Sequence, residues 1–298
     1  MAARKMSLRV RRTSGEVTFS VFNTVFLVLV AAVCLFPFVH VAARSVSSES
    51  AIVTGRVTVY PIEAHVRAYS TILGNVGMQQ ALRFTVLLTV VGTAVNLAIT
   101  IMGAYPLSKR RLVGRRAIWI FIIVTMFFNG GLIPTYLVVR AVGLLNRIWA
   151  LILPIAINTF YLIIMKTFFQ SIPDSLEESA KIDGASDLQV LVRVVLPLSM
   201  PIIATLTLFY SVSHWNQFFL ALIYINDTRK FTLQLKLRQM VIQDDIAQML
   251  EGSAFAQSIP RESIKAAAVM YATIPILMVY PWLQKYFVRG VLLGSLKG

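Results

Sequence analysis

Six stretches of this sequence are each long and apolar enough to cross a lipid bilayer as a helix. The hydrocarbon core of a bilayer is about 30 Å thick, so a spanning helix needs about 20 mostly apolar residues. Backbone groups cannot stay unpaired in hydrocarbon, which predicts helices rather than strands. We therefore expect an all-α polytopic membrane protein with a single transmembrane domain over residues 1–298. The six predicted spans are residues 17–43, 78–105, 117–139, 148–168, 198–225 and 263–288.

The distribution of charge predicts how these spans are oriented. The formal net charge is +15, and Lys and Arg gather in short clusters between the apolar stretches. Such clusters mark the cytoplasmic loops of membrane proteins, whereas a nucleic-acid-binding domain carries its cations on one face. With six spans, the clusters within residues 4–12, 109–116 and 285–297 fall on one side. We therefore predict a protein of the bacterial cytoplasmic (inner) membrane, with both termini in the cytoplasm and no nucleic-acid partner.

The sequence lacks the motifs of an energy source and of hydrolytic chemistry. It holds no G-x-x-x-x-G-K-[ST] phosphate loop, no H-E-x-x-H zinc helix and no G-x-S-x-G serine elbow. No Asp or Glu lies at the centre of a predicted span, and ion-coupled carriers usually need such groups. We therefore expect a chain without catalytic residues, cofactor or metal. Active transport through it would take its energy from a partner protein.

The predicted cytoplasmic loop between the fourth and fifth spans, residues 171–197, is acidic where the other cytoplasmic loops are basic. Ser171 followed by Pro173 is typical of a helix start, and Asp183-Gly184 predicts a turn. Such a projection is poorly suited to lipid, so we expect it to meet a basic protein surface. The carboxylates that it offers to that surface are Glu177, Glu178 and Asp183.

A second helix is predicted after this turn. Ser186 and Gln189, three residues apart, form a capping box, and Pro197 limits the helix. The apolar positions between them recur at helical spacing, which predicts one buried stripe. The residues of that stripe are Leu188, Leu191, Val192, Val195 and Leu196.

The loop resembles the EAA loop of ABC importer permeases. The run Glu178-Ser-Ala-Lys-Ile-Asp-Gly-Ala185 carries this resemblance, and Pro197 follows at the usual interval. Serine stands at position 179, where the pattern prefers alanine. Two further stretches resemble the carbohydrate-uptake branch of these permeases. One is residues 213–219, and the other is the C-terminal part of the chain, from residues 266–270 through 284–290 to 294–298.

The resemblance implies a type I importer permease fold in which residues 171–197 form a coupling helix. That helix would sit in a cleft of an ATPase subunit, with Glu178 as a docking charge and Gly184 permitting the turn. Ala180 and Ala185 would allow close approach. The residues expected to couple to the ATPase are Glu177, Glu178, Ser179, Ala180, Asp183, Gly184, Ala185 and Pro197.

The same resemblance implies a set of partners. They are a homologous second permease subunit, two ABC ATPase subunits that bind ATP and Mg, and an extracytoplasmic solute-binding protein. Membrane lipid would surround the spans. In the carbohydrate branch, the predicted outer loop 226–262 approaches the solute-binding protein. Residues 235–249 within that loop are predicted to form an amphipathic helix.

A polar and aromatic cluster is the candidate substrate pathway. An aromatic ring stacks on the C–H face of a sugar, and amides bind its hydroxyls. The alternative is that these side chains make interhelical contacts. The candidates are His214, Trp215, Asn216 and Gln217 in the fifth span, with Asn158 and Tyr161 in the fourth.

The expected cargo is a sugar or an oligosaccharide. Residues 233–243 look closest to permeases for oligosaccharides, including those that contain uronate. A cationic entrance would suit an acidic sugar. Three alternatives stay open: a secondary carrier or channel, a non-transport membrane scaffold, and an importer for another solute.

Overall fold

The computed structural model describes residues 13–242 and 261–295, with side chains described up to residue 278. Within these ranges the chain forms helices and no strand, which confirms the all-α prediction. The described residues divide into two compact units. One comprises residues 13–69 and 261–270, and the other comprises residues 70–242 and 271–295.

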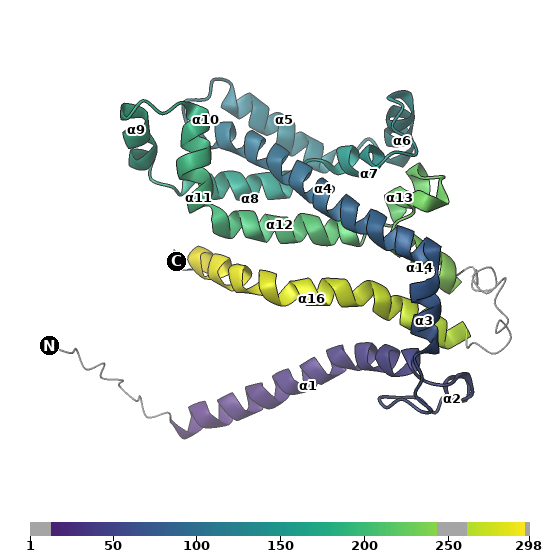
Figure 1. The fold of residues 1–298 in the computed structure, drawn as a ribbon. Coiled ribbons are helices and arrows are strands. Elements are labelled where there is room, and N and C mark those ends of the chain that lie inside the picture. Colours follow the sequence, from purple (N-terminus) through teal and green to yellow (C-terminus); the bar gives the residue numbers. More distant parts are fainter. Residues whose placement is uncertain (1–12, 243–260, 296–298) are drawn as a thin grey trace. The chain divides into compact units, whose positions relative to one another are not determined.

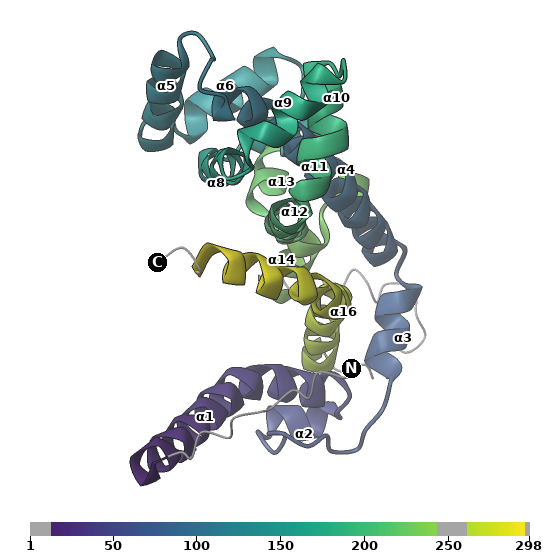
Figure 2. The same cartoon turned by 90° about the vertical axis from the view of Figure 1, so that its left-hand side faces the viewer.

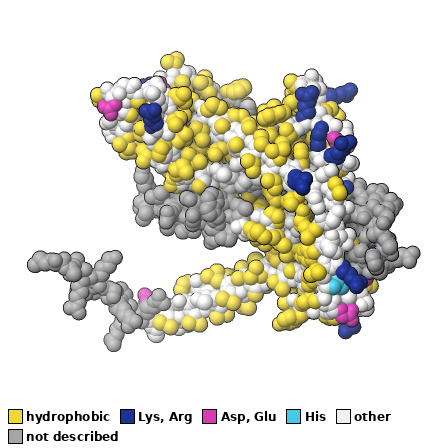
Figure 3. Space-filling view, viewed as in Figure 1, with side chains coloured by type: hydrophobic (Ala, Val, Ile, Leu, Met, Phe, Trp, Pro, Cys, Tyr) yellow, Lys and Arg dark blue, Asp and Glu magenta, His cyan; other side chains and the backbone are white. Residues whose placement is uncertain are grey.

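The first unit is built on the long helix α1 (Ser14–Ser45), followed by the short helix α2 (Glu49–Val53). Most of α1 exposes apolar side chains, as Figure 3 shows along its visible length. A small core of Ala43, Ala51, Ile52 and Val57 closes its end. Arg44 forms a 2.9 Å ion pair with Glu262 at the start of α16 (Arg261–Ser295). An exposed apolar helix of this length needs lipid or a partner protein around it.

The second unit is arranged around the long helix α4 (Figures 1 and 2). Helices α8 and α12 pack against α4, and α9 and α10 protrude at one end of the unit. The remainder of α16 also belongs to this unit. Up to residue 182 its helices are α3 (Arg67–Gly74, which begins in the first unit), α4 (Val76–Ser108), α5 (Arg115–Phe127), α6 (Leu132–Ala141), α7 (Trp149–Ile152), η1 (Leu153–Ile155), α8 (Thr159–Gln170) and α9 (Asp174–Ile182). The next are α10 (Asp187–Val190), the π-helix η2 (Leu191–Val195), α11 (Leu196–Leu198), α12 (Met200–Trp215), α13 (Phe219–Tyr224), η3 (Thr228–Lys230) and α14 (Leu233–Ile242).

A seam of polar contacts joins α4 to α12. Asn96 Nδ2 lies 3.2 Å from His214 Nε2, and Thr100 Oγ1 lies 2.7 Å from Tyr210 OH. All four side chains are buried. One turn before Asn96, a Cβ atom at Gly92 would lie 2.6 Å from the His214 ring. Glycine therefore lets the two helices approach closely enough for the polar side chains to meet, as small residues do between membrane helices.

Only some of the predicted spans are continuous helices. Among the described residues, α1 and α4 are each long and apolar enough to cross a membrane alone. Three further candidates are bent pairs: α5 with α6 at 113°, α7–η1 with α8 at 60°, and α10–α11 with α12 at 83°. The sixth predicted span coincides with part of α16. The count of six spans stays a prediction.

The fifth predicted span, residues 198–225, differs from a single helix. It is interrupted after Ser199 and again at residues 216–218, between α12 and α13. Gln217 holds the second break in place, since its backbone O accepts from Thr232 Oγ1 (2.8 Å) and its Nε2 donates to Leu151 O (3.0 Å). Apolar composition alone does not reveal such breaks, because the bonds that stabilise them come from distant residues.

Gly92→Ala is expected to destabilise the second unit. The added Cβ would meet the fully buried His214 ring, and overpacking of this kind costs about 1–3 kcal/mol. Thermal unfolding of the purified protein in detergent measures the change. Gly103→Ala is the matched control in the same helix, because its Cβ would meet only Leu162 Cδ1 at 3.3 Å. If Gly92→Ala were as stable as the control, the close packing of α4 against α12 at Gly92 would be disproved.

Candidate functional site

The acidic loop folds as a helical hairpin, which we call the acidic hairpin (residues 171–197). Its first helix, α9, begins at Asp174, directly after Pro173. The predicted start at Ser171 is wrong, because Ser171 ends α8 and its Oγ donates to Phe168 O at 2.7 Å. The predicted turn is confirmed, since Gly184 has φ = +83°, a conformation that favours glycine.

The second arm of the acidic hairpin begins as predicted but buries a different stripe. Ser186 and Gln189 form the predicted capping box. The arm then continues as the π-helix η2, which adds a residue to one turn and rotates the later positions. The buried apolar residues of this arm are Val190, Leu191 and Val195. Two members of the predicted stripe, Leu188 and Val192, are exposed instead.

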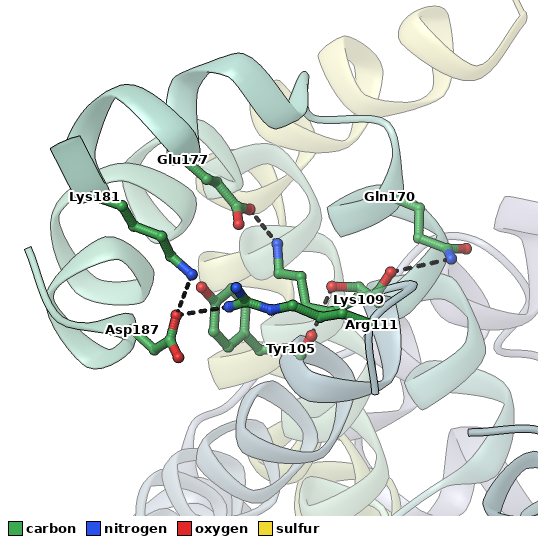
Figure 4. Close-up of polar contacts among 8 residues, drawn as sticks. Tyr105, Lys109, Arg111, Gln170, Glu177, Lys181 and Asp187 are labelled. Atoms are coloured by element: carbon green, nitrogen blue, oxygen red, sulfur yellow. Dashed lines mark hydrogen bonds and ion pairs between the residues drawn. The ribbon is translucent and has the colours of Figure 1, made fainter. Parts of the chain in front are cut away.

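Ion pairs join the acidic hairpin to the cluster of Lys and Arg that follows α4, which we call the basic segment (residues 109–116) (Figure 4). Lys109 pairs with Glu177, and both side chains are largely buried. Asp187 at the start of α10 pairs with Arg111 (2.9 Å) and with Lys181 (2.6 Å). The hairpin is therefore tied to the end of α4 by charges of opposite sign.

The two sets of ion pairs differ in strength. The hydrogen bond from Lys181 and its charge, followed by the charge of Arg111, hold the pKa of Asp187 below its usual value. A lowered folded pKa adds stability above the unfolded pKa of about 3.9, and this is lost as the pH falls through the folded pKa. Asp187 and Arg111 are both exposed, so this contribution is small. Lys109 and Glu177 are largely buried, so removing one partner would leave a buried charge without its counter-ion, which costs more than losing an exposed pair.

A cavity of about 410 Å³ lies between the acidic hairpin and the basic segment. Its charged groups are largely those that the ion pairs already use. The lining residues are Ser108, Lys109, Arg110, Arg111, Phe169, Gln170, Asp174, Glu177, Glu178 and Lys181.

The structure separates the predicted coupling residues into two groups. Glu178, Ser179, Asp183 and Gly184 are exposed on the hairpin. The other group faces the protein: Glu177 is only 7% exposed, and Ala180 and Ala185 pack against the core of the second unit. Pro197 lies in α11. The expectation that Glu177 is offered outward to a partner is therefore wrong, because Lys109 of the same chain neutralises it.

The predicted substrate-pathway residues also divide by exposure. His214, Trp215 and Gln217 are buried, and each bonds to another helix or loop of the second unit, Trp215 through a 3.2 Å bond from Nε1 to Ala272 O. Asn216 is exposed at the break after α12. In the fourth span, Asn158 caps α8, and the Tyr161 ring lies edge-on to Tyr210. Contact of these six residues with substrate stays a prediction.

The predicted outer helix is present in part as α14, which starts at Leu233. The portion predicted over residues 243–249 lies outside the described residues. So do the side chains of residues 284–298, which belong to the resemblance noted in the sequence.

Comparison with known proteins identifies the family. Residues 100–293 match the family model described as "Binding-protein-dependent transport system inner membrane component". This chain is a member of that family. The acidic hairpin and the helices around α4 and α12 are therefore parts of an ABC importer permease, and the predicted fold is confirmed.

Individual relatives agree with this assignment. The polygalacturonan/rhamnogalacturonan transport system permease YtcP of Bacillus subtilis is 46% identical over 278 residues, covering 92% of this chain and 96% of the relative. Protein LplC of the same organism is 46% identical over 287 residues, covering 96% and 97%. A solved chain of a bacterial ABC transporter that imports the acidic polysaccharide alginate superposes with a TM-score of 0.88 at 34% identity. That match covers 93% of this permease and 99% of the solved chain.

Sequence reasoning missed two functional features of the permease. It treated Lys109 and Arg111 only as charges that fix membrane orientation, whereas both pair with the acidic hairpin. The available signal was a basic loop and an acidic loop predicted on the same side of the membrane. It also missed Gln234 and Arg238 of α14, which contact Asn216 and Phe218 at the break after α12.

Glu177→Gln is expected to loosen α9. It leaves the largely buried Lys109 ammonium without its counter-ion, which is more costly than losing an exposed pair. Hydrogen exchange of the amides of α9 measures the effect, and we expect it to rise about tenfold, which corresponds to about 1.4 kcal/mol. Glu178→Gln, at an exposed neighbour, is the control and should change exchange by less than about twofold. Equal exchange in both variants would show that the Lys109 pair does not brace the hairpin.

Proposed function

We propose that this permease is the non-catalytic translocation subunit of an ATP-driven importer for oligosaccharides that contain uronate. We further propose that its acidic hairpin receives the movement of an ATPase subunit. The observation that carries this proposal is the buried pair of Lys109 with Glu177, which ties α9 to the end of α4. A displacement of α9 would therefore pull on α4 and, through its seam with α12, on the centre of the second unit.

The outward face of the acidic hairpin suits a protein cleft. Ile182 is 86% exposed and Leu176 is 44% exposed, which is unfavourable in water and favourable once covered by a partner. Glu178 and Asp183 lie exposed on the same hairpin and keep their charges available. In this proposal Glu178 is the docking carboxylate and Glu177 is the internal brace. Gly184 forms the tip, where its positive φ is needed.

The remaining partners follow from the same proposal. A second, homologous permease subunit would complete the pathway, and two ATPase subunits would bind ATP and Mg. An extracytoplasmic solute-binding protein would deliver the sugar. The absence of a phosphate-loop motif supports a chain that binds no nucleotide itself. The basic segment beside the acidic hairpin supports a cytoplasmic hairpin and cytoplasmic termini.

The proposed cargo rests on the relatives and on charge. One close relative is named for polygalacturonan and rhamnogalacturonan, and the similar solved transporter imports alginate. Lys and Arg side chains gather over α6 and α13 (Figure 3). Arg140 and Arg147 are exposed there, and no carboxylate among the described residues forms an ion pair with either. A cationic surface of this kind attracts an anionic sugar.

Glu178→Arg is expected to uncouple the importer. Charge reversal would place a cation against the basic cleft that we propose for the ATPase, and like charges across an interface are strongly unfavourable. We expect sugar-stimulated ATPase activity of the importer in proteoliposomes to fall about tenfold, the equivalent of about 1.4 kcal/mol. Membrane insertion should be unchanged, since Glu178 makes no ion pair among the described side chains.

Glu63→Arg provides the control for net charge, because Glu63 is an exposed carboxylate far from the acidic hairpin in sequence. It should leave the stimulated ATPase rate unchanged. A normal sugar-stimulated ATPase rate in Glu178→Arg would disprove the proposal that the acidic hairpin docks to the ATPase subunit through Glu178.

Uptake should favour an oligogalacturonate over a neutral oligosaccharide of the same length. Raising the salt concentration from about 0.1 M to about 1 M shortens the screening length from about 10 Å to about 3 Å. The preference should therefore decline with salt while neutral uptake stays constant. Uptake of radiolabelled sugars into proteoliposomes measures both rates. A preference for the neutral sugar at low salt would disprove the proposed cargo.

A further inference from the structure

The break between α12 and α13 exposes a small group of side chains that no part of the coupling mechanism uses. Non-helical backbone at membrane depth is tolerated where it is buried in protein or lines a cavity. In secondary transporters, broken helices commonly form the substrate site. In this permease, residues 216–218 interrupt the fifth predicted span, and Thr232, just before α14, bonds to this break. The start of α14 is therefore fixed beside the break.

Four side chains from the break and from α14 lie together. Gln234 Nε2 donates to Asn216 Oδ1 at 3.4 Å. One turn later on α14, the guanidinium carbon of Arg238 lies 5.4 Å from the centroid of the Phe218 ring. Because Gln234 and Arg238 are four residues apart, they share one face of the helix. The group thus places two amides beside one aromatic ring and one cation.

The group is accessible from outside the second unit. Asn216 and Arg238 are exposed, Phe218 is 39% exposed and Gln234 is half-buried. Its neighbours in the fifth span, His214 and Gln217, are buried and already bonded. A ligand could therefore reach these four side chains without rearranging the helices.

Arg238 differs from Arg229 and Lys230, the two cations just before α14. Arg229 and Lys230 lie 3.8 Å and 3.7 Å from the carboxylate oxygens of Asp227. Within residues 13–242 and 261–278, no carboxylate pairs with Arg238. Its contact with Phe218 is through the face of the ring, which uses none of the five N–H donors. With respect to the described side chains, those donors are therefore free to bind an anion.

The geometry points to a uronate subsite formed by Asn216, Phe218, Gln234 and Arg238. The guanidinium of Arg238 would bind the sugar carboxylate with two parallel hydrogen bonds, a geometry that arginine provides and lysine does not. The Phe218 ring would cover the C–H face of the same sugar, and the two amides would bind its hydroxyls. This inference rests on the proposed function. It identifies Arg238 as the residue that selects acidic sugars.

Uptake of a trigalacturonate and of its fully methyl-esterified form tests the subsite. The two sugars differ at their carboxyl groups, and hence in charge, but share their rings and all of their hydroxyls. The binding protein is wild type in every assay and is saturated with each sugar beforehand. Arg238→Gln should reduce uptake of the acidic sugar about tenfold, as expected for losing a hydrogen bond to a charged group. Uptake of the ester should change by less than about twofold, which also shows that the variant is folded and assembled.

Three further variants make the test specific. Arg238→Lys keeps the charge but not the two parallel bonds, so it should recover only part of the acidic uptake. Phe218→Leu removes the stacking surface and should slow both sugars. Arg229→Gln, which removes a cation already facing Asp227, is the matched control and should slow neither sugar by more than about twofold.

The outcomes separate the subsite from the proposed function. If Arg238→Gln slows both sugars equally, Arg238 serves another contact, such as the one with the binding protein, and the subsite is disproved while uronate import stands. If the wild-type importer itself does not favour the acidic sugar, the proposed cargo is wrong and the subsite fails with it.

Discussion

The close approach of α4 and α12 is the contact on which the rest of the second unit depends. Gly92 presents no side chain opposite His214, so the two helices can approach closely at this point. Asn96 and Thr100 then find their partners on α12 within hydrogen-bond distance. Because α8 and the acidic hairpin pack around the same two helices, the position of each functional group follows from this single contact.

Local rules of helix formation predicted local structure well. The capping box at Ser186 and the turn at Gly184 were both predicted from a few adjacent residues, and the structure contains both. The start of α9 was misplaced because Ser171 was assigned to the wrong helix, where its hydroxyl bonds backward to Phe168. The apolar stripe of the second arm was predicted for one regular α-helix, whereas residues 191–195 form a π-helix. Periodicity cannot anticipate an inserted residue.

Contacts between distant residues were beyond such rules. Glu177 and Lys109 are separated by 68 positions, so nothing in the sequence around Glu177 distinguishes an internal brace from a docking charge. The same holds for the group at the break, where Phe218 and Arg238 come from different elements. The family resemblance predicted the overall fold correctly, because it carries long-range information that composition and spacing lack. It did not assign these pairings.

The break at residues 216–218 also separates two sets of attachments. Before the break along the chain, α12 is bonded to α4 through His214 and Tyr210. Beyond it, α13 is joined to the connection between α6 and α7, where Asn146 N donates to Tyr224 O at 2.8 Å. Gln217 within the break is itself fixed by its bonds to Thr232 and Leu151. This span is therefore held by separate contacts on either side of a fixed break, and its two helical halves are not joined by one continuous run of helical hydrogen bonds.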